Sequence, residues 1–121
     1  MDYEIDHIAE TGIVRIKVNE PITAELVLSF TKDAINTAGQ HGSLRYLVDV
    51  RRAKNVTGTC DQYSLAYEEM ERLGLDRASR IAVLISPGDT SHDFIETVFR
   101  NAGYDCQLFL EEGEADAWLM S

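Results

Sequence analysis

Residues 46–50 read YLVDV, an apolar run that passes directly into the basic, polar loop RRAKNVTGT at residues 51–59. A short apolar run of this kind is typical of a buried β-strand, and a helical pattern begins where the loop ends. In open α/β sheets, ligands and partners meet the protein at the carboxyl ends of the strands. We therefore expect the functional surface of the chain at this junction.

The composition is that of an ordinary globular domain with a strong acidic excess. The chain has 121 residues, of which 45% are hydrophobic and 26% are charged, and we interpret residues 1–121 as one domain with its own core. Its 21 acidic and 11 basic residues give a net charge of -10. This charge disfavours nucleic acids as partners, because binding them requires lysine and arginine to neutralise phosphates. It equally disfavours docking on anionic membrane surfaces.

The sequence carries no sign of membrane insertion or secretion. No stretch approaches the ~20 apolar residues of an integral membrane segment, and residues 1–10 are acidic and lack the apolar core of a signal peptide. The two cysteines, Cys60 and Cys106, lie far apart and form no C-x-x-C motif. We therefore expect a cytoplasmic protein with reduced thiols.

Strand-like and helix-like patterns alternate along the chain. Apolar residues alternate with polar ones over residues 3–9 and 14–18, on either side of a Thr-Gly turn, which predicts a β-hairpin. Three further apolar runs predict strands at residues 44–50, 81–85 and 106–110. Helical spacing predicts helices at residues 24–39, 60–73, 91–102 and around 115–119. The order β-β-α-β-α-β-α-β-α is typical of an α/β domain with a mixed, mostly parallel five-stranded sheet.

Polar side chains stand where the predicted helices begin. Thr23 precedes the first helix, and Thr59 with Gln62 fits the S/T-x-x-E/Q capping box at the start of the second. Before the third helix, we expect Asp89 or Thr90 to bind the first free amide groups. The first three predicted helices thus each have a candidate side chain that fixes their start.

The second predicted helix carries apolar residues at a spacing of three and four: Tyr63, Ala66, Tyr67, Met70 and Leu73. This spacing is typical of the side of a helix that packs against a core. We therefore predict that both tyrosines are core residues. Residues off this side of the helix are left for a partner surface.

The order of elements, with residues 46–51 before a loop and a capped helix, resembles the STAS domain of anti-sigma-factor antagonists. More closely, the chain is similar to the SpoIIAA-like branch of the STAS/Sec14-like superfamily, through residues 73–77, 91–104 and 114–119. The similarity covers nearly the whole chain. It implies a STAS-like fold and a non-enzymatic regulatory or protein-interaction role without a cofactor. The relationship to Sec14 implies a lipid-like or small apolar ligand, although a chain of this length has little room for a lipid pocket.

The resemblance also implies a regulatory residue after the strand at residues 46–50. Antagonists of the STAS type carry a serine there, in a pattern like Asp-Ser-Ser-Gly, whereas residues 55–60 of this chain read NVTGTC. The acidic residue and the serines are missing, so Thr57 and Thr59 are the candidate phospho-acceptors. Alternatively, Thr59 only caps the helix and Thr57 only forms a turn with Gly58.

Three basic side chains, Arg51, Arg52 and Lys54, lie between the strand and the helix start. The free amide groups and the dipole of a helix N-terminus favour an anion, and nearby arginines add to this preference. One interpretation is therefore a site for a phosphate, a carboxylate or an acidic partner. The alternative is a solvated loop that pairs with the protein's own acidic residues.

The loop after the next parallel strand is expected to lie beside this one, and it carries Asp89 and His92. His92 is a candidate ligand contact at the shared crevice, or else a surface residue in the first turn of a helix. With Ser91 and Asp93 it has the residue types of a hydrolase triad. Adjacent helical residues do not converge, however, and the chain has no G-x-S-x-G motif.

Other catalytic or metal-binding patterns are missing from the sequence. The histidines and cysteines show no metal-ligand spacing, and there is no P-loop or G-x-G-x-x-G motif. The leading hypothesis is therefore a protein-interaction module that uses the loop at residues 51–59 and the adjoining helix. The alternative is a domain for a small anionic or lipid-like ligand at the strand-end crevice, and the third possibility is an unrecognised enzyme. A homodimer is compatible with each of them.

Overall fold

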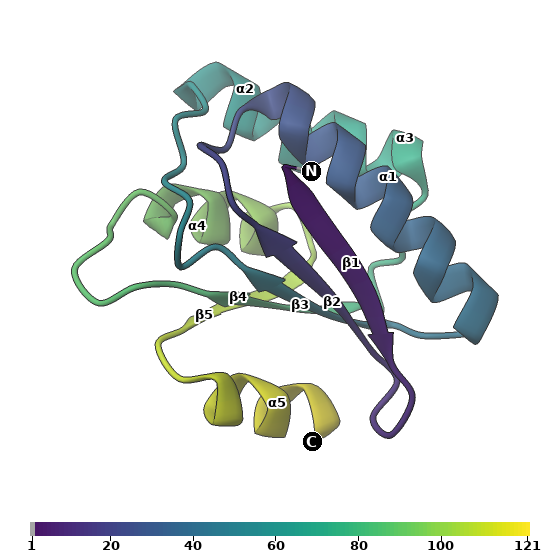
Figure 1. Cartoon of the computed structure of the whole chain (residues 1–121). Helices are drawn as coiled ribbons and strands as arrows, with labels where there is room; N and C mark the ends of the chain where they lie inside the picture. Colours follow the sequence, from purple (N-terminus) through teal and green to yellow (C-terminus); the bar gives the residue numbers. More distant parts are fainter. Residues whose placement is uncertain (1) are drawn as a thin grey trace.

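The computed structural model describes residues 2–121, which form an α/β domain around a single five-stranded sheet (Figure 1). The strands, in the order β1-β2-β3-β4-β5 across the sheet, are Tyr3–Ile8 (β1), Ile13–Val18 (β2), Arg45–Asp49 (β3), Arg80–Leu84 (β4) and Asp105–Phe109 (β5). Strand β1 is antiparallel to β2, and the other three pairs are parallel. The predicted mixed, mostly parallel sheet is therefore confirmed.

The helical segments cover the two faces of the sheet unequally. They are Ala24–His41 (α1), Thr59–Ser64 (α2), the π-helix Leu65–Glu69 (η1), Met70–Leu73 (α3), Asp93–Asn101 (α4) and Glu112–Met120 (α5). Helices α1 to α4 lie on one face and α5 alone lies on the other (Figure 1). A large apolar core fills the first interface, and a smaller one lies beneath α5.

The alternation of side chains along the central strands explains these two cores. In β3, Tyr46 and Val48 point to the side of α1 to α4, whereas Leu47 packs in the smaller core with α5. In β4, Ile81 and Ala82 divide between the cores in the same way. Central strands buried on both faces read as continuous apolar runs, which is why residues 46–48 and 81–85 predict them correctly.

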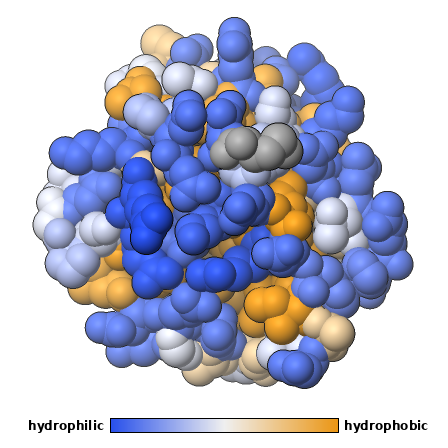
Figure 2. Space-filling view, viewed as in Figure 1, coloured by the Kyte–Doolittle hydropathy of each residue, from blue (hydrophilic) through white to orange (hydrophobic). Residues whose placement is uncertain are grey.

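Most apolar side chains are turned inward. Figure 2 shows one side of the molecule as mainly hydrophilic, with hydrophobic residues in small separate patches. Within residues 2–121, none of the helices is both long and apolar enough to cross a membrane.

The helix starts confirm one predicted cap and contradict two. The Thr23 hydroxyl accepts a hydrogen bond from the Leu26 amide at 3.2 Å, as expected. Thr59, in contrast, is the first helical residue of α2, and Gly58 occupies the cap position without a side-chain bond. The predicted capping box is therefore wrong, because the helix begins one residue earlier. The Gln62 side chain instead donates to the carbonyl of Thr57 at 2.9 Å.

The predicted cap of α4 is also wrong. This helix begins at Asp93, after His92, and no side chain caps it. The Asp89 carboxylate accepts from the backbone amide of Ser91 at 2.9 Å, which closes a turn before the helix. Asp89 therefore shapes the loop, and the helix starts further along the chain than the pattern indicates.

The π-helix η1 changes which side chains of the second helical region are buried. Its extra residue per turn is seen where the Met70 amide donates to the carbonyl of Leu65, five residues earlier. As a result Leu65 and Met70 are buried, whereas Tyr63 and Tyr67 are 49% and 46% exposed. The prediction that both tyrosines belong to the core is therefore wrong, since a spacing of three and four does not follow one face through a π turn.

The two threonines at helix starts give a matched pair for testing the caps. We expect Thr23→Ala to lower the free energy of unfolding by about 1 kcal/mol, because a cap bond is lost. Thr59→Ala, which removes an exposed hydroxyl that makes no cap bond, should change it by less than about 0.5 kcal/mol. Urea denaturation of both variants measures the difference, and equal losses would contradict the assignment of the caps.

Candidate functional site

A cluster of four charged side chains marks the carboxyl end of β3. The Asp49 carboxylate is 4% exposed and accepts from the Arg51 guanidinium at 3.0 and 2.8 Å. The Arg15 guanidinium approaches the same carboxylate to 3.2 Å. Glu112 of α5 lies 3.1 Å from Arg15 and 3.5 Å from Arg51. This Asp49 cluster therefore balances two positive against two negative charges.

The Asp49 cluster determines the ionisation of its buried carboxyl. Burial alone raises the pKa of Asp49, because a charged carboxylate is less stable away from water. The hydrogen bonds from Arg51 and the positive charges of Arg51 and Arg15 outweigh burial and lower the pKa below its ordinary value of 3.8. The carboxylate is consequently ionised at neutral pH and holds both arginines in place.

The three basic residues of the loop are not equivalent. Arg51 is neutralised by Asp49 and Glu112, which agrees with the interpretation that the loop pairs with the protein's own acids. Arg52 and Lys54 are exposed, and neither forms an ion pair within residues 2–121. A role of these three side chains in binding an anion or an acidic partner stays a prediction, and only two of them are open to it.

The loops after β3 and β4 lie side by side, as the parallel topology led us to expect. The backbone amide of Asn55 donates to the Ser91 hydroxyl at 3.0 Å, and the Ser86 hydroxyl donates to the carbonyl of Arg51 at 2.7 Å. Asn55 also bridges to Ile22, in the segment that follows β2. Three loops at one end of the sheet are thus tied together by backbone and side-chain bonds.

The two candidate phospho-acceptors differ in how their hydroxyl groups are used. Thr57 is half-buried, and its hydroxyl donates to the carbonyl of Ile22 at 3.1 Å. Thr59 is exposed at the start of α2. Phosphorylation of either residue stays a prediction. The internal bond of Thr57 makes Thr59 the more accessible of the two.

His92 is buried between the two loops and is not a surface residue. It is 2% exposed, and its Nε2 lies 3.0 Å from the carbonyl oxygen of Ala53 and 3.5 Å from the Asp89 carboxylate. The expectation of a surface position is wrong because the loop after β4 folds back over the loop after β3. Hydrogen bonds to Ser91 lower the pKa of the Asp89 carboxyl, with a smaller contribution from the positive charge of Lys54.

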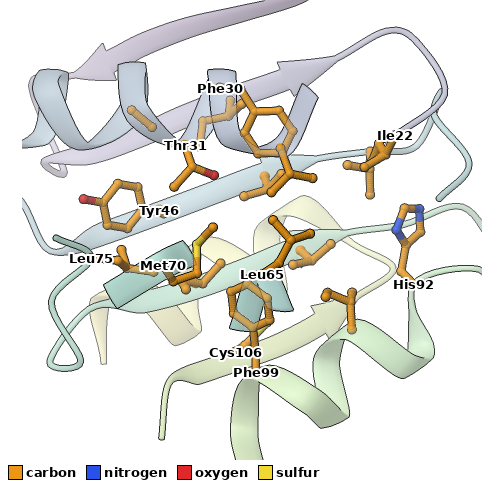
Figure 3. A pocket seen from close by; sticks show the side chains of 18 of the residues that line it. Ile22, Phe30, Thr31, Tyr46, Leu65, Met70, Leu75, His92, Phe99 and Cys106 are labelled. Atoms are coloured by element: carbon orange, nitrogen blue, oxygen red, sulfur yellow. The ribbon is translucent and has the colours of Figure 1, made fainter. Parts of the chain in front are cut away.

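A half-enclosed cavity of about 110 Å³ lies between the sheet and helices α1 to α4 (Figure 3). Its walls are apolar side chains from β3, α1, η1, α3 and α4, among them Val48, Phe30, Ala34, Leu65, Met70 and Phe99. His92 and Ile22 stand at one end of the cavity, and Tyr46 and Leu75 at the other (Figure 3). The sequence did not predict this space. Its small volume agrees with the expectation that a chain of this length has little room for a lipid pocket.

Three polar side chains, His92, Asn55 and Thr57, line one end of the cavity, while Tyr46 lines the other end and Thr31 is also part of the lining (Figure 3). The Asn55 amide donates to the Gln62 side chain at 3.3 Å and its oxygen accepts from the Thr57 amide at 3.0 Å. No Asp, Glu, Lys or Arg of residues 2–121 lines the cavity. Sequence reasoning missed Asn55 and took Gln62 for a cap partner. The sequence offers one signal for these two residues, which is that both amide side chains come after the buried strand at residues 46–50.

Among the described residues, no group of three or more His, Cys, Asp or Glu side chains is placed to hold a metal ion. Cys106 lines the cavity, and burial raises the pKa of its thiol to about 12. The thiol is therefore protonated at neutral pH and serves as a small apolar wall group. The arrangement is suited to holding an uncharged group out of water.

The low pKa of Asp49 predicts a loss of stability in acid. The folded pKa lies below the value of about 3.9 in an unfolded chain, so the stabilisation is present above that value and is lost as the pH falls through the folded pKa. We expect Asp49→Asn to lower the free energy of unfolding at pH 7 by about 2–3 kcal/mol, because it leaves Arg15 and Arg51 without their buried partner. Denaturation at pH 7 and at pH 3 should show the difference from the wild type shrinking in acid.

Asp105→Asn is the control for this prediction. Asp105 forms an exposed ion pair with Arg80 at 3.6 Å, and such pairs contribute about 0–1 kcal/mol. The prediction is contradicted if Asp49→Asn lowers the free energy of unfolding as little as Asp105→Asn does, or by the same amount at pH 7 and at pH 3. Either result would show that the Asp49 cluster does not stabilise the fold.

Comparison with known proteins identifies the fold. No family model and no curated protein sequence matches the chain. Among solved structures, it is similar to an uncharacterised protein of the DUF3478 family with a SpoIIAA-like fold from Shewanella loihica PV-4. The match has a TM-score of 0.54 and 16% sequence identity, and it covers 97% of this chain and 91% of that chain. The expected SpoIIAA-like fold is therefore confirmed: the chain has a SpoIIAA-like α/β fold.

Proposed function

We propose that the chain is a non-enzymatic binding domain, and that its ligand is a compact apolar or amphiphilic molecule held in the cavity. The observation that carries this proposal is the half-enclosed, mainly apolar space beneath α1 to α4, which has a few polar side chains in its lining. Ligand sites in proteins are typically concave and mainly apolar, with a small number of polar groups that orient the ligand. The cavity also reaches the carboxyl ends of the strands, where open α/β sheets bind their ligands.

The volume sets the size of the ligand. An engineered apolar cavity of about 150 Å³ binds benzene, and this cavity has about 110 Å³ and is open on one side. Because this volume is smaller, a short branched chain of a few carbon atoms fits, and a ring would extend partly into the open side. A larger amphiphile would place one such group inside and leave the remainder outside.

The lining favours the apolar ligand over the anionic one. Lys and Arg side chains do not line the cavity, and Arg51 is paired on the other side of the sheet with Asp49 and Glu112. A carboxylate or phosphate in this space would lose its hydration without gaining a cationic partner, which costs several kcal/mol. The ligand group that enters the cavity is therefore uncharged.

The π-helix supports a binding role at this place. Leu65 begins η1 and Met70 follows it, and both side chains line the cavity. A π turn is less stable than regular helix and occurs frequently at functional sites. Here it turns Leu65 and Met70 together into the cavity.

Filling the cavity tests this proposal. Ala34 of α1 is buried and lines the space, so Ala34→Leu should place its added carbons where the ligand would lie. We expect the wild type to bind toluene, with amide shifts at the lining residues in an NMR titration. Ala34→Leu should weaken this binding at least tenfold without lowering stability, since cavity-filling changes commonly add about 0.5–2 kcal/mol.

Ala117→Leu provides the matched control, because Ala117 is exposed on α5, on the other face of the sheet. It should bind toluene like the wild type. Absence of toluene binding to the wild type, or equal binding to the wild type and Ala34→Leu, would refute the cavity as a ligand site.

Protein interaction is the second candidate function, and a separate observation favours it. Tyr63, Tyr67 and Phe94 are 49%, 46% and 37% exposed and form one aromatic patch. The ring of Tyr63 lies 6.2 Å from that of Tyr67 and 5.4 Å from that of Phe94. Clustered exposed aromatic side chains are typical of the centre of a protein interface. The patch adjoins the loop at residues 51–59 through α2, as the leading hypothesis requires.

The surroundings of the aromatic patch define its partner. Asp61, Glu68 and Asp93 are exposed on the same helical segments, and the whole chain carries a charge of -10. Aromatic rings attract lysine and arginine cations, and acidic neighbours add to this attraction. We therefore propose a partner segment that combines basic and apolar side chains.

A pair of peptides tests this second candidate. We expect a peptide of alternating lysine and leucine to shift the amide resonances of residues 59–68 and 93–97, and a glutamate-leucine peptide of equal length to leave them unchanged. Tyr63→Ala and Phe94→Ala should each weaken binding by about fivefold, or ~1 kcal/mol. Leu110→Ala, which truncates an exposed side chain elsewhere, should have no effect. Equal response to both peptides would contradict the proposed partner.

A further inference from the structure

We infer that the cavity selects a ligand with a hydroxyl group, which donates its hydrogen bond to Nδ1 of His92. This inference rests on the proposed binding function of the cavity and names the polar group of its ligand. His92 is 2% exposed, and its ring stands at one end of the cavity (Figure 3). His92 is a buried, titratable side chain, and it lies at the end of the cavity next to the loops after β3 and β4.

The hydrogen bond of Nε2 fixes the tautomer of the ring. The carbonyl oxygen of Ala53, at 3.0 Å, can only accept, so Nε2 must carry the proton. The Asp89 carboxylate, 3.5 Å from the same nitrogen, favours the same arrangement. In the neutral imidazole, a proton on Nε2 leaves Nδ1 as an acceptor. Both polar contacts of the ring within residues 2–121 use Nε2, so Nδ1 is left for a ligand.

The other polar groups at this end offer the ligand more acceptors than donors. The Thr57 hydroxyl gives its hydrogen to the carbonyl of Ile22 at 3.1 Å, which leaves its oxygen lone pairs. The Asn55 side chain gives one of its two amide hydrogens to Gln62, and its oxygen accepts from the Thr57 amide, so one N–H of Asn55 is left. This end of the cavity therefore presents mainly acceptors to a ligand. A ligand hydroxyl group can donate to His92 and can also accept from the remaining Asn55 N–H, whereas a carboxylate cannot donate and would lie near the negative charge of Asp89.

Three probes of similar shape separate these chemistries: toluene, phenol and benzoate. Toluene and phenol have the same size and differ in whether a methyl or a hydroxyl group reaches the polar end. We expect wild-type protein to bind phenol about 3–10-fold more tightly than toluene, the range for one neutral hydrogen bond, and benzoate more weakly than either. NMR titration of backbone amides measures all three affinities.

The ring nitrogens of His92 give a direct readout in the wild-type protein. In ¹⁵N spectra, Nε2 should carry the proton and Nδ1 should not, and the Nδ1 resonance should shift with phenol but not with toluene. A proton on Nδ1 in the free protein at neutral pH would overturn the inference. This measurement needs no variant, so it holds even where a substitution at this buried position disturbs folding.

His92→Gln is the matching variant, because its amide can still donate to the carbonyl of Ala53 but has no imidazole nitrogen at the Nδ1 position. We expect this variant to bind phenol and toluene with about equal affinity, so the preference for phenol is lost while toluene still binds. Toluene binding with no preference for phenol in the wild type, or an unchanged preference in His92→Gln, would overturn this inference alone. Failure of both toluene and phenol to bind would refute the proposed function together with it.

Discussion

The buried carboxylate of Asp49 is the constraint on which the arrangement of the strand ends depends. It accepts from Arg51 at 3.0 and 2.8 Å and approaches Arg15 at 3.2 Å, and both arginines reach Glu112 of α5. One ionised group therefore joins β2, β3, the following loop and the last helix. Removing water from a carboxylate is costly unless cations replace it, so the basic start of the loop is a structural consequence of a charged strand end.

The pleat of β3 separates this charge from the cavity. Leu47 and Asp49 are two residues apart and point to the side of α5, whereas Tyr46 and Val48 point to the side of α1 to α4. Side chains two residues apart share a face of a strand, so the Arg51 side chain follows the Asp49 carboxylate to the α5 side. The sheet itself thus shields the apolar cavity from the ion pairs. This separation is why an uncharged ligand and a basic loop are compatible within one small domain.

The sequence predicts what depends on periodicity and misses what depends on one extra residue. Alternation and helical spacing identify all five strands in their order, and Thr23 marks the start of α1 correctly. The π turn after Leu65 could not be predicted, because the spacing of Tyr63 and Tyr67 fits a regular helix equally well. Nor does any local pattern place His92 under the Ala53 carbonyl, a contact across 39 positions of sequence. The site therefore depends on loop packing that periodicity does not encode.

The two proposed binding surfaces share the segment from α2 to α3. Leu65 and Met70 line the cavity from this segment, and Tyr63 and Tyr67 stand on its exposed side. A ligand couples to a distant surface only if it binds two arrangements of the connecting element with different affinity. The bond from the Met70 amide to the Leu65 carbonyl is the one that differs between a π turn and a regular helical turn. Conversion between these turns would rotate Tyr67, which lies within η1, relative to Leu65, whereas Tyr63 lies before this turn in α2. If a ligand in the cavity changes the affinity of the aromatic patch for a partner, then the partner must change the affinity of the cavity for the ligand by the same factor.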